Sequence, residues 1–261
     1  MRRDLARELQ GAVIDDVSVT GARSVRRNDA AAFRRGLRGR TLASFGRHGK
    51  YLLLGLDNGR VLVGHLRMSG QFLLVPSGAA EVKHTHVRLA LADGRELRFV
   101  DPRTFGELFV TTADLPELAT LGVDALALDR PRLRALLGAR RGRLKALLLD
   151  QRVIAGIGNI YSDEILWTAR LRGSRQANRL RPVEVGRLHD AIAGILGEAV
   201  ERRGSSLSDA QYVDLAGQPG SYQEAHNVYG REGLPCPRCG RAIERTVVAQ
   251  RSHFWCRNCQ R

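Results

Sequence analysis

The sequence predicts a fold of mixed α and β character, divided into a mainly-β first part, a helical middle part and a small metal-binding end. Three observations support this division. Apolar residues alternate in short runs over the first 112 residues, a pattern typical of strands. They recur every three or four positions over residues 130–203, a pattern typical of helices. All four cysteines fall within residues 236–259.

The first part is expected to be a sandwich or a barrel with helical trimming. Residues 2–10 are expected to form a short helix, because Leu5 and Leu9 lie four positions apart and a glycine follows. Turn sequences at 57–59 and 93–94 are each flanked by apolar runs, and they predict two β-hairpins. Further strands are expected at 13–19, 72–75 and 107–111.

The middle part should contain at least two helices. Leu144, Leu147 and Leu148 share one helical face, and Pro182 stands at a suitable first position of a longer helix. The segment 204–229 is rich in Gly, Ser and Gln, so we expect a long loop there.

The end of the chain carries the most specific motif. Cys236 and Cys239 form one Cys-x-x-Cys pair, and Cys256 and Cys259 form another. Two such pairs predict one tetrahedral site for a structural zinc ion. Two disulfides or a redox pair are the alternative, but a Cys-x-x-Cys disulfide is strained and no secretion signal is visible. Basic and aromatic residues between the pairs suggest a β-hairpin.

The charge of the chain indicates its partner. Lys and Arg number 42 against 27 Asp and Glu, a net charge of +15. This surplus favours a nucleic-acid partner over a basic surface that only aids solubility. The arginines are dispersed through the sequence, which favours a shaped groove. No apolar run approaches the ~20 residues that span a bilayer, so a cytosolic protein without a membrane partner is expected.

Two glycines lie where one helix gives way to the next, in the segment Ala155–Tyr161. Small residues at a helix start let a phosphate approach free backbone N–H groups. Asn159 could cap the second helix and donate its amide to the same phosphate. A tight helical turn with a satisfied cap is the alternative.

Two further motifs follow strands. Met68, beside Ser-Gly turn residues, could wedge between base pairs, although core packing is the commoner role for a lone methionine. Arg103 could bond to a base edge and Phe105 could stack or wedge, although a β-turn with a surface Arg and a buried Phe is the alternative.

Three other residues are candidates. Lys50 precedes an apolar strand and could serve phosphate binding or proton transfer, although a lone Lys at a strand edge is usually solvated. His84 and His86 alternate and should share one strand face. A DNA contact or a structural role is preferred to metal binding, because no third ligand is evident.

Together these segments resemble the formamidopyrimidine-DNA glycosylase (Fpg/Nei) family over essentially the whole chain. The motifs that match are, in order, Lys50-Tyr51-Leu52-Leu53, His65-Leu66-x-Met68-Ser69-Gly70, Lys83-His84-x-His86, Asp101-Pro102-Arg103-x-Phe105-Gly106, Gly156-Ile157-Gly158-Asn159-Ile160-Tyr161, Val228-Tyr229-Gly230-Arg231 and the finger with Gln250-Arg251. The resemblance implies an α+β multidomain fold. Its domains would be an N-terminal β-sandwich over 1–115, a helix-two-turn-helix domain over 116–229 and a C-terminal zinc-finger β-hairpin over 230–261.

The resemblance also implies a function, that of a monomeric base-excision-repair enzyme. Such a DNA glycosylase and AP lyase would remove 8-oxoguanine and formamidopyrimidines from double-stranded DNA in a bacterial cytoplasm, at the nucleoid. Met68, Arg103 and Phe105 match the side chains that fill the void left by the damaged base, with Arg103 facing the orphaned cytosine. This triad is typical of the Fpg branch.

Other matched positions would grip the DNA. Lys50, Asn159 and Arg251 match residues that hold phosphates around the flipped nucleotide, and Lys50 and Arg251 also match the proton donors for elimination. Further DNA-binding positions are matched by His65, His84, Arg103 and Arg141. The loop from Ser205 to Tyr222 corresponds to one that closes over the extruded base. Gly173 stands where the family commonly has proline.

The chain departs from the family at its start. Family members begin Met-Pro-Glu-Leu-Pro-Glu; the proline amine is the nucleophile and the adjoining Glu handles protons. Here Met1 is followed by Arg2, and about nine family residues that include both groups have no counterpart. The chain as printed is therefore expected to bind damaged DNA but to lack Schiff-base chemistry.

Two explanations of this departure are open. The start could lie upstream, with Met1 being a misread valine codon. The protein could instead be a glycosylase-derived binder of lesions that does not cut. An alternative function of a different class is a zinc-ribbon adaptor that binds nucleic acid and has no catalytic ancestry.

Overall fold

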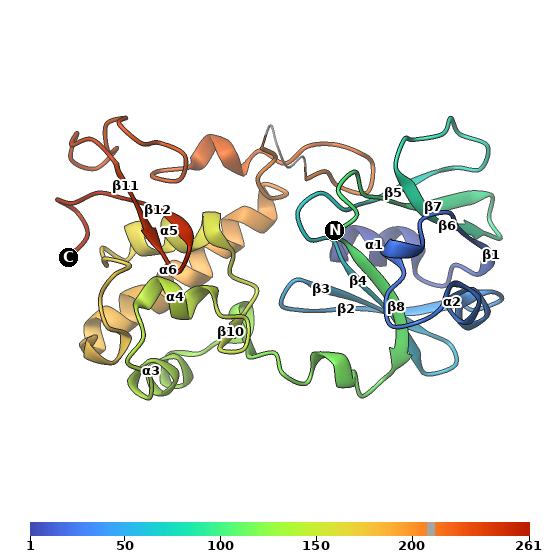
Figure 1. Ribbon diagram of the computed structural model, residues 1–261, viewed down its shortest axis with the longest axis horizontal. Helices are drawn as coiled ribbons and strands as arrows, with labels where there is room; N and C mark the ends of the chain where they lie inside the picture. The colour runs from blue at the N-terminus through green and yellow to red at the C-terminus, as the bar shows by residue number, and fades with distance from the viewer. Residues whose placement is uncertain (208–211) are drawn as a thin grey trace. The chain divides into compact units, whose positions relative to one another are not determined.

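The computed structural model of the protein describes residues 1–207 and 212–261 (Figure 1). Contacts divide the chain into two compact units, each made of two segments. The first unit is Met1–Ala119 with Arg203–Ser221, and the second is Thr120–Arg202 with Tyr222–Arg261. Within the described ranges, no helix has the length and apolar character needed to cross a membrane.

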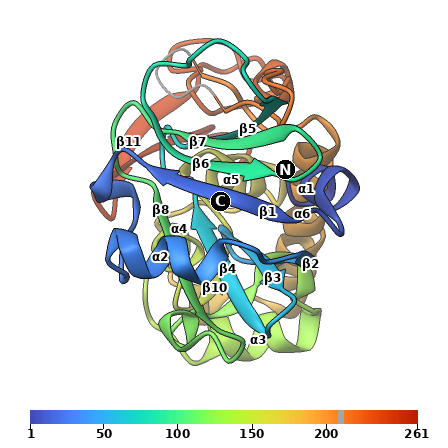
Figure 2. The same ribbon diagram turned by 90° about the vertical axis from the view of Figure 1, so that its right-hand side faces the viewer.

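The first unit is a β-sandwich of two four-stranded antiparallel sheets (Figure 2). One sheet has the order β1-β6-β7-β5 and the other β2-β3-β4-β8. The strands are β1 Ile14–Val19, β2 Leu42–His48, β3 Tyr51–Leu56, β4 Arg60–His65, β5 Gln71–Pro76, β6 Thr85–Leu91, β7 Arg95–Val100 and β8 Glu107–Thr112. Of the two architectures considered from the residues, the sandwich is the one that forms.

Alternation along the strands builds the core of this unit. In β6, every second residue from Thr85 to Leu91 is buried, as expected for a strand with one face on a core. Helices α1 (Arg2–Leu9) and α2 (Ala30–Leu37) add Leu5, Leu9, Phe33 and Leu37 to the same cluster. The helix expected at 2–10 and both predicted hairpins are therefore confirmed.

The second unit is mainly helical. Its apolar cluster joins the inward faces of three α-helices to the long α6, which buries Val185, Leu188, Ile192 and Ile195 at helical spacing. The elements are β9 Val123–Asp124, α3 Arg130–Gly138, α4 Leu144–Leu149, β10 Ile154–Ala155, α5 Asn159–Thr168 and α6 Pro182–Glu201. The predicted helix start at Pro182 is confirmed.

The second unit also contains the C-terminal hairpin, β11 (Glu244–Val248) paired with β12 (Arg251–Trp255). In contrast, part of the Gly- and Ser-rich segment packs on the first unit. There the backbone N–H of Leu74 donates to the carbonyl of Leu215 at 2.9 Å, and the Leu215 side chain joins the sandwich core. Residues 208–211 of the expected base-covering loop lie outside the described residues.

Candidate nucleic-acid interface

The two candidate wedge residues stand on short loops at strand ends of the first unit. Met68 follows β4 and Phe105 precedes β8, and their side chains are 55% and 53% exposed. Among the described residues of the first unit, these are the two most exposed large apolar side chains. Arg103 lies half-buried in the same loop as Phe105. The core-packing alternative for Met68 and the buried-Phe alternative for Phe105 are therefore wrong.

A shallow hollow of about 390 Å³ lies beside Phe105. It is lined by Ala22, Arg23, Val25, Arg26, Thr104 and Phe105. The two arginines make this hollow electropositive, which suits a phosphate next to an inserted ring.

Lys50 and His65 lie near each other, where β3 begins and the neighbouring strand β4 ends. Lys50 is exposed in the turn before β3, and Tyr51 pairs with His65 across β3 and β4. His65 is only 8% exposed, and burial lowers its pKa to about 3, with help from the charges of Arg67 and Lys50. The imidazole is therefore neutral at physiological pH.

The tautomer of His65 follows from its bonding. Its Nδ1 accepts a hydrogen bond from the backbone N–H of Arg67 at 2.9 Å, so the ring proton sits on Nε2. Glu107 is buried beside it and accepts from Arg67 Nη2 at 2.9 Å and from the Tyr51 hydroxyl at 3.4 Å. His65 can thus donate one hydrogen bond to an anion without contributing a charge.

His84 is exposed immediately ahead of β6 and has a left-handed backbone, with φ of 67°. The strand begins at Thr85, so the simple alternation with His86 does not hold at His84. His86 instead donates from Nε2 to the carbonyl of Asp101 at 2.9 Å. Only His84 of this pair is presented outward.

In the second unit, Asn159 is the first residue of α5. The capping role expected for it is wrong, because Gly158 takes the N-cap position with an extended backbone. The side-chain Oδ1 of Asn159 is buried and finds no hydrogen-bond partner among the described residues. Gln151 braces the glycine loop by accepting from Gly156 N–H at 2.9 Å. Arg141 is exposed in the loop between α3 and α4.

The four cysteines form the metal site. Their sulfur atoms all lie within 4.8 Å of one another, and no disulfide joins any of them. The distances Cys236 Sγ–Cys259 Sγ of 4.0 Å and Cys239 Sγ–Cys256 Sγ of 3.5 Å suit thiolates ~2.3 Å from one tetrahedral zinc. The site is therefore a structural zinc site, and the disulfide alternative is wrong.

Arg251 lies at the tip of the zinc hairpin, where it is exposed and pairs with Val248. The two turn residues Ala249 and Gln250 both have positive φ, 50° and 59°. A two-residue turn of this kind matches the twist of a hairpin but strains non-glycine residues. The turn fixes the position of Arg251, the first residue of β12.

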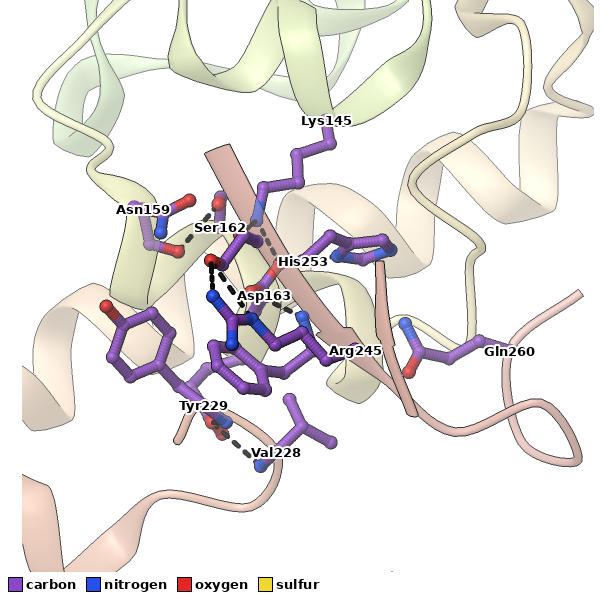
Figure 3. A network of polar contacts seen from close by, with 12 residues as sticks. Lys145, Asn159, Ser162, Asp163, Val228, Tyr229, Arg245, His253 and Gln260 are labelled. Carbon is purple, nitrogen blue, oxygen red and sulfur yellow. Dashed lines mark hydrogen bonds and ion pairs between the residues drawn. The ribbon is translucent and has the colours of Figure 1, made fainter. Parts of the chain in front are cut away.

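A buried polar network holds this hairpin on α5 (Figure 3). Asp163 accepts from Lys145 Nζ at 2.6 Å, from His253 Nδ1 at 2.7 Å and from Phe254 N–H at 3.0 Å. Lys145 also donates to the carbonyl of Ser252 at 2.6 Å. Burial lowers the Lys145 pKa, and the charge of Asp163 opposes that shift.

The same helix anchors the segment ahead of the finger. Glu164 is fully buried and accepts from the backbone N–H groups of Asn227, Val228 and Tyr229, each at 2.9 Å. Gly173 leaves room for the network, since a Cβ there would come within 2.8 Å of His253 Nε2. A side chain at position 173 would therefore push His253 out of this network.

Sequence reasoning missed Lys145, Asp163, Glu164 and His253. The available signal was the adjacent carboxylates of Asp163 and Glu164 directly before the apolar run 165–167, because buried acids need partners. The structure brings Lys50, His65, Met68, His84, Arg103 and Phe105 into one unit, and Arg141, Asn159, Arg251 and the four cysteines into the other.

Family models match almost the whole chain. Residues 1–108 match the formamidopyrimidine-DNA glycosylase N-terminal domain. Residues 121–211 match the formamidopyrimidine-DNA glycosylase H2TH domain, and residues 233–261 match the zinc finger found in FPG and IleRS.

Known proteins agree with these matches. Formamidopyrimidine-DNA glycosylase of Salinispora tropica is 45% identical, over all of this chain and 93% of that protein, and that of Pelotomaculum thermopropionicum is 40% identical, over all of this chain and 96% of that protein. The crystal structure of MutM (Fpg) from Thermus thermophilus is 42% identical, with a TM-score of 0.87 over 99% of this chain and 95% of that chain. Lactococcus lactis Fpg in complex with abasic-site DNA is 32% identical, with a TM-score of 0.91 over 99% of this chain and 96% of that chain. This chain therefore belongs to the formamidopyrimidine-DNA glycosylase family.

Proposed function

We propose that this protein is a DNA glycosylase and AP lyase that excises oxidised purines, 8-oxoguanine and formamidopyrimidines, from double-stranded DNA. The observation that carries the proposal is the pair of exposed apolar tips, Met68 and Phe105, with Arg103 between them in sequence. Apolar side chains at such tips can enter a duplex and replace a lost base in the stack. Solved relatives include complexes of Lactococcus lactis Fpg with abasic-site DNA and with DNA that contains Fapy-dG.

The remaining candidates take supporting roles. Lys50, Asn159 and Arg251 would hold phosphates around the extruded nucleotide, with Lys50 and Arg251 as proton donors for elimination. Asn159 lies at the start of a helix, which favours anions, and its side-chain NH₂ group is a donor that a phosphate can accept. His65, His84 and Arg141 would add DNA contacts. Zinc would hold the Arg251 hairpin and do no chemistry, because four thiolates leave no open coordination position.

We further propose the domain division 1–115, 116–229 and 230–261, a monomeric state and an association with the bacterial nucleoid in the cytoplasm. The bacterial relatives and the DNA substrate support the location. Analytical ultracentrifugation checks the monomeric state: the free protein should sediment with the mass of one chain, and its DNA complex with the mass of one chain and one duplex.

The test is a duplex with one 8-oxoguanine opposite cytosine, incubated with the protein with and without borohydride. Release of the base, strand cleavage at the lesion and a trapped covalent adduct are expected of a chain that carries the family's N-terminal proline. The 261 residues as printed should bind the lesion and give no adduct, because the proline amine has no counterpart among them. A non-cutting binder of damaged DNA would still release no base after that proline is restored. Equal affinity for damaged and undamaged duplexes would contradict both and favour a zinc-ribbon adaptor.

A further inference from the structure

Asp101 links the loops that carry the wedge residues. It follows β7, and its side chain is 0% exposed. Its Oδ1 accepts hydrogen bonds from the Ser69 hydroxyl and, at 3.3 Å, from the backbone N–H of Arg103. Its Oδ2 accepts from the backbone N–H of Gly106 at 2.7 Å. One carboxylate therefore bonds to the Met68 loop and to both sides of Phe105.

The main chain of Asp101 adds a third loop. Its N–H donates to the carbonyl of His84 at 3.0 Å, and its own carbonyl accepts from Thr104 N–H at 3.2 Å and from His86 Nε2 at 2.9 Å. The backbone at position 106 can approach the Asp101 carboxylate because it is a glycine. A Cβ there would lie 2.6 Å from the Phe99 ring and 3.0 Å from Asp101 Oδ2. The whole assembly lies within the first unit.

We propose that Asp101 is a positioning residue that sets Met68, Arg103 and Phe105 relative to one another before DNA binds; this inference rests on the proposed function. Side chains that enter a base stack must be held in place, because ordering mobile loops on binding costs affinity. An amide at this position cannot replace the carboxylate. In either orientation its NH₂ group would face a backbone N–H, that of Gly106 or that of Arg103, and would leave that donor without an acceptor.

The experiment compares Asp101→Asn with Asp93→Asn. Asp93 lies in the exposed turn at the other end of β7, so its substitution makes the same change of charge away from the loops. The probes are an undamaged duplex and a duplex with a tetrahydrofuran abasic analogue opposite cytosine. A 2-aminopurine next to the analogue reports unstacking by its fluorescence. Each Kd is measured over a range of NaCl concentrations.

Asp101→Asn should weaken binding to the abasic duplex by about tenfold or more and should lose most of the fluorescence rise. Affinity for undamaged DNA and the slope of log K against log salt should match those of Asp93→Asn, because the phosphate contacts remain. Ser69→Ala removes only the bond to the Met68 loop, so a loss of about threefold is expected. It also carries the test if Asp101→Asn does not fold.

Parallel losses on both duplexes, or an unchanged preference and fluorescence in Asp101→Asn, would overturn the positioning role alone. For Ser69→Ala, an unchanged preference would do the same. A wild-type protein without any preference for the abasic duplex would overturn the proposed function as well. The wild-type ratio of Kd values therefore separates the two failures.

Discussion

Replacing Lys145 with methionine should destabilise the second unit by about 3–5 kcal/mol. Lys145 and Asp163 are both 0% exposed, and their charged atoms are 2.6 Å apart. Methionine keeps the apolar stem of the side chain but removes the cation. Among the described residues, the hydrogen-bond donors that remain to the buried Asp163 carboxylate are then His253 Nδ1 and the Phe254 N–H, and an uncompensated buried carboxylate is costly.

Tryptophan fluorescence during urea unfolding measures this cost. The chain has two tryptophans, Trp167 and Trp255, and both lie in the second unit, so the signal follows that unit alone. The matched control is Arg187→Met, which removes an exposed cation from α6. It should change the unfolding free energy by less than about 0.5 kcal/mol.

A double substitution sharpens the test. Adding Asp163→Asn to Lys145→Met removes the orphaned charge, so the double variant should lose clearly less than the sum of the two single variants. A loss below about 1 kcal/mol in Lys145→Met, typical of an exposed pair, would refute the view that this ion pair holds the hairpin on α5. Strictly additive losses would refute the coupling of the two charges.

Three other changes have defined outcomes. Because His65 is neutral, with a pKa of about 3, His65→Gln should weaken DNA binding about three- to tenfold, equally from pH 5.5 to 8 and at an unchanged salt slope. Lys50→Gln should reduce the slope of log K against log salt by about 1. A reduced slope in His65→Gln would contradict a neutral His65. Hydrogen bonds from Arg175 lower the pKa of Glu184 to about 2, so its stabilisation is full above pH ~4.5 and is lost as pH falls toward 2. The stability difference between wild type and Glu184→Gln, followed by fluorescence, should thus be larger at pH 7 than at pH 3, and an equal difference would argue against the shift. The Trp167 indole N–H donates to Cys236 Sγ at 3.4 Å, so Trp167→Phe should speed zinc transfer to a chromogenic chelator several-fold. The matched change Trp255→Phe should leave the rate of zinc transfer unchanged, because the Trp255 indole N–H has no partner among the described residues.

Much of the fold was visible in the sequence because local patterns determine it. The turn glycines Gly59 and Gly94 adopt positive φ after the alternating strands β3 and β6, as their sequence predicted. The spacing of the cysteines led to the sulfur cluster directly. Met68 and Phe105 were identified from strand-end motifs together with the family resemblance, and their exposure agrees with that role.

The long-range partners were not visible. A lone Lys145 in sequence is expected at the surface, and its burial depends on Asp163, which lies 18 residues away, and on Ser252, which lies 107 residues away. The return of Leu215 to the sandwich core likewise needs a tertiary contact that no local pattern encodes. Asn159 was misassigned as a cap, because Gly158 also suits that position.

The most direct test of lesion recognition is the ratio of Kd values for undamaged and 8-oxoguanine-containing duplexes, measured at one salt concentration. It is compared between the wild-type protein and the triple variant Met68→Ala, Arg103→Ala, Phe105→Ala. The wild type should prefer the damaged duplex by about tenfold or more, since loss of the opened pair lowers the cost of insertion. The triple variant should lose this preference and keep its affinity for undamaged DNA within about threefold. Equal affinities in the wild type, or a preference that persists in the triple variant, would contradict recognition by these three residues.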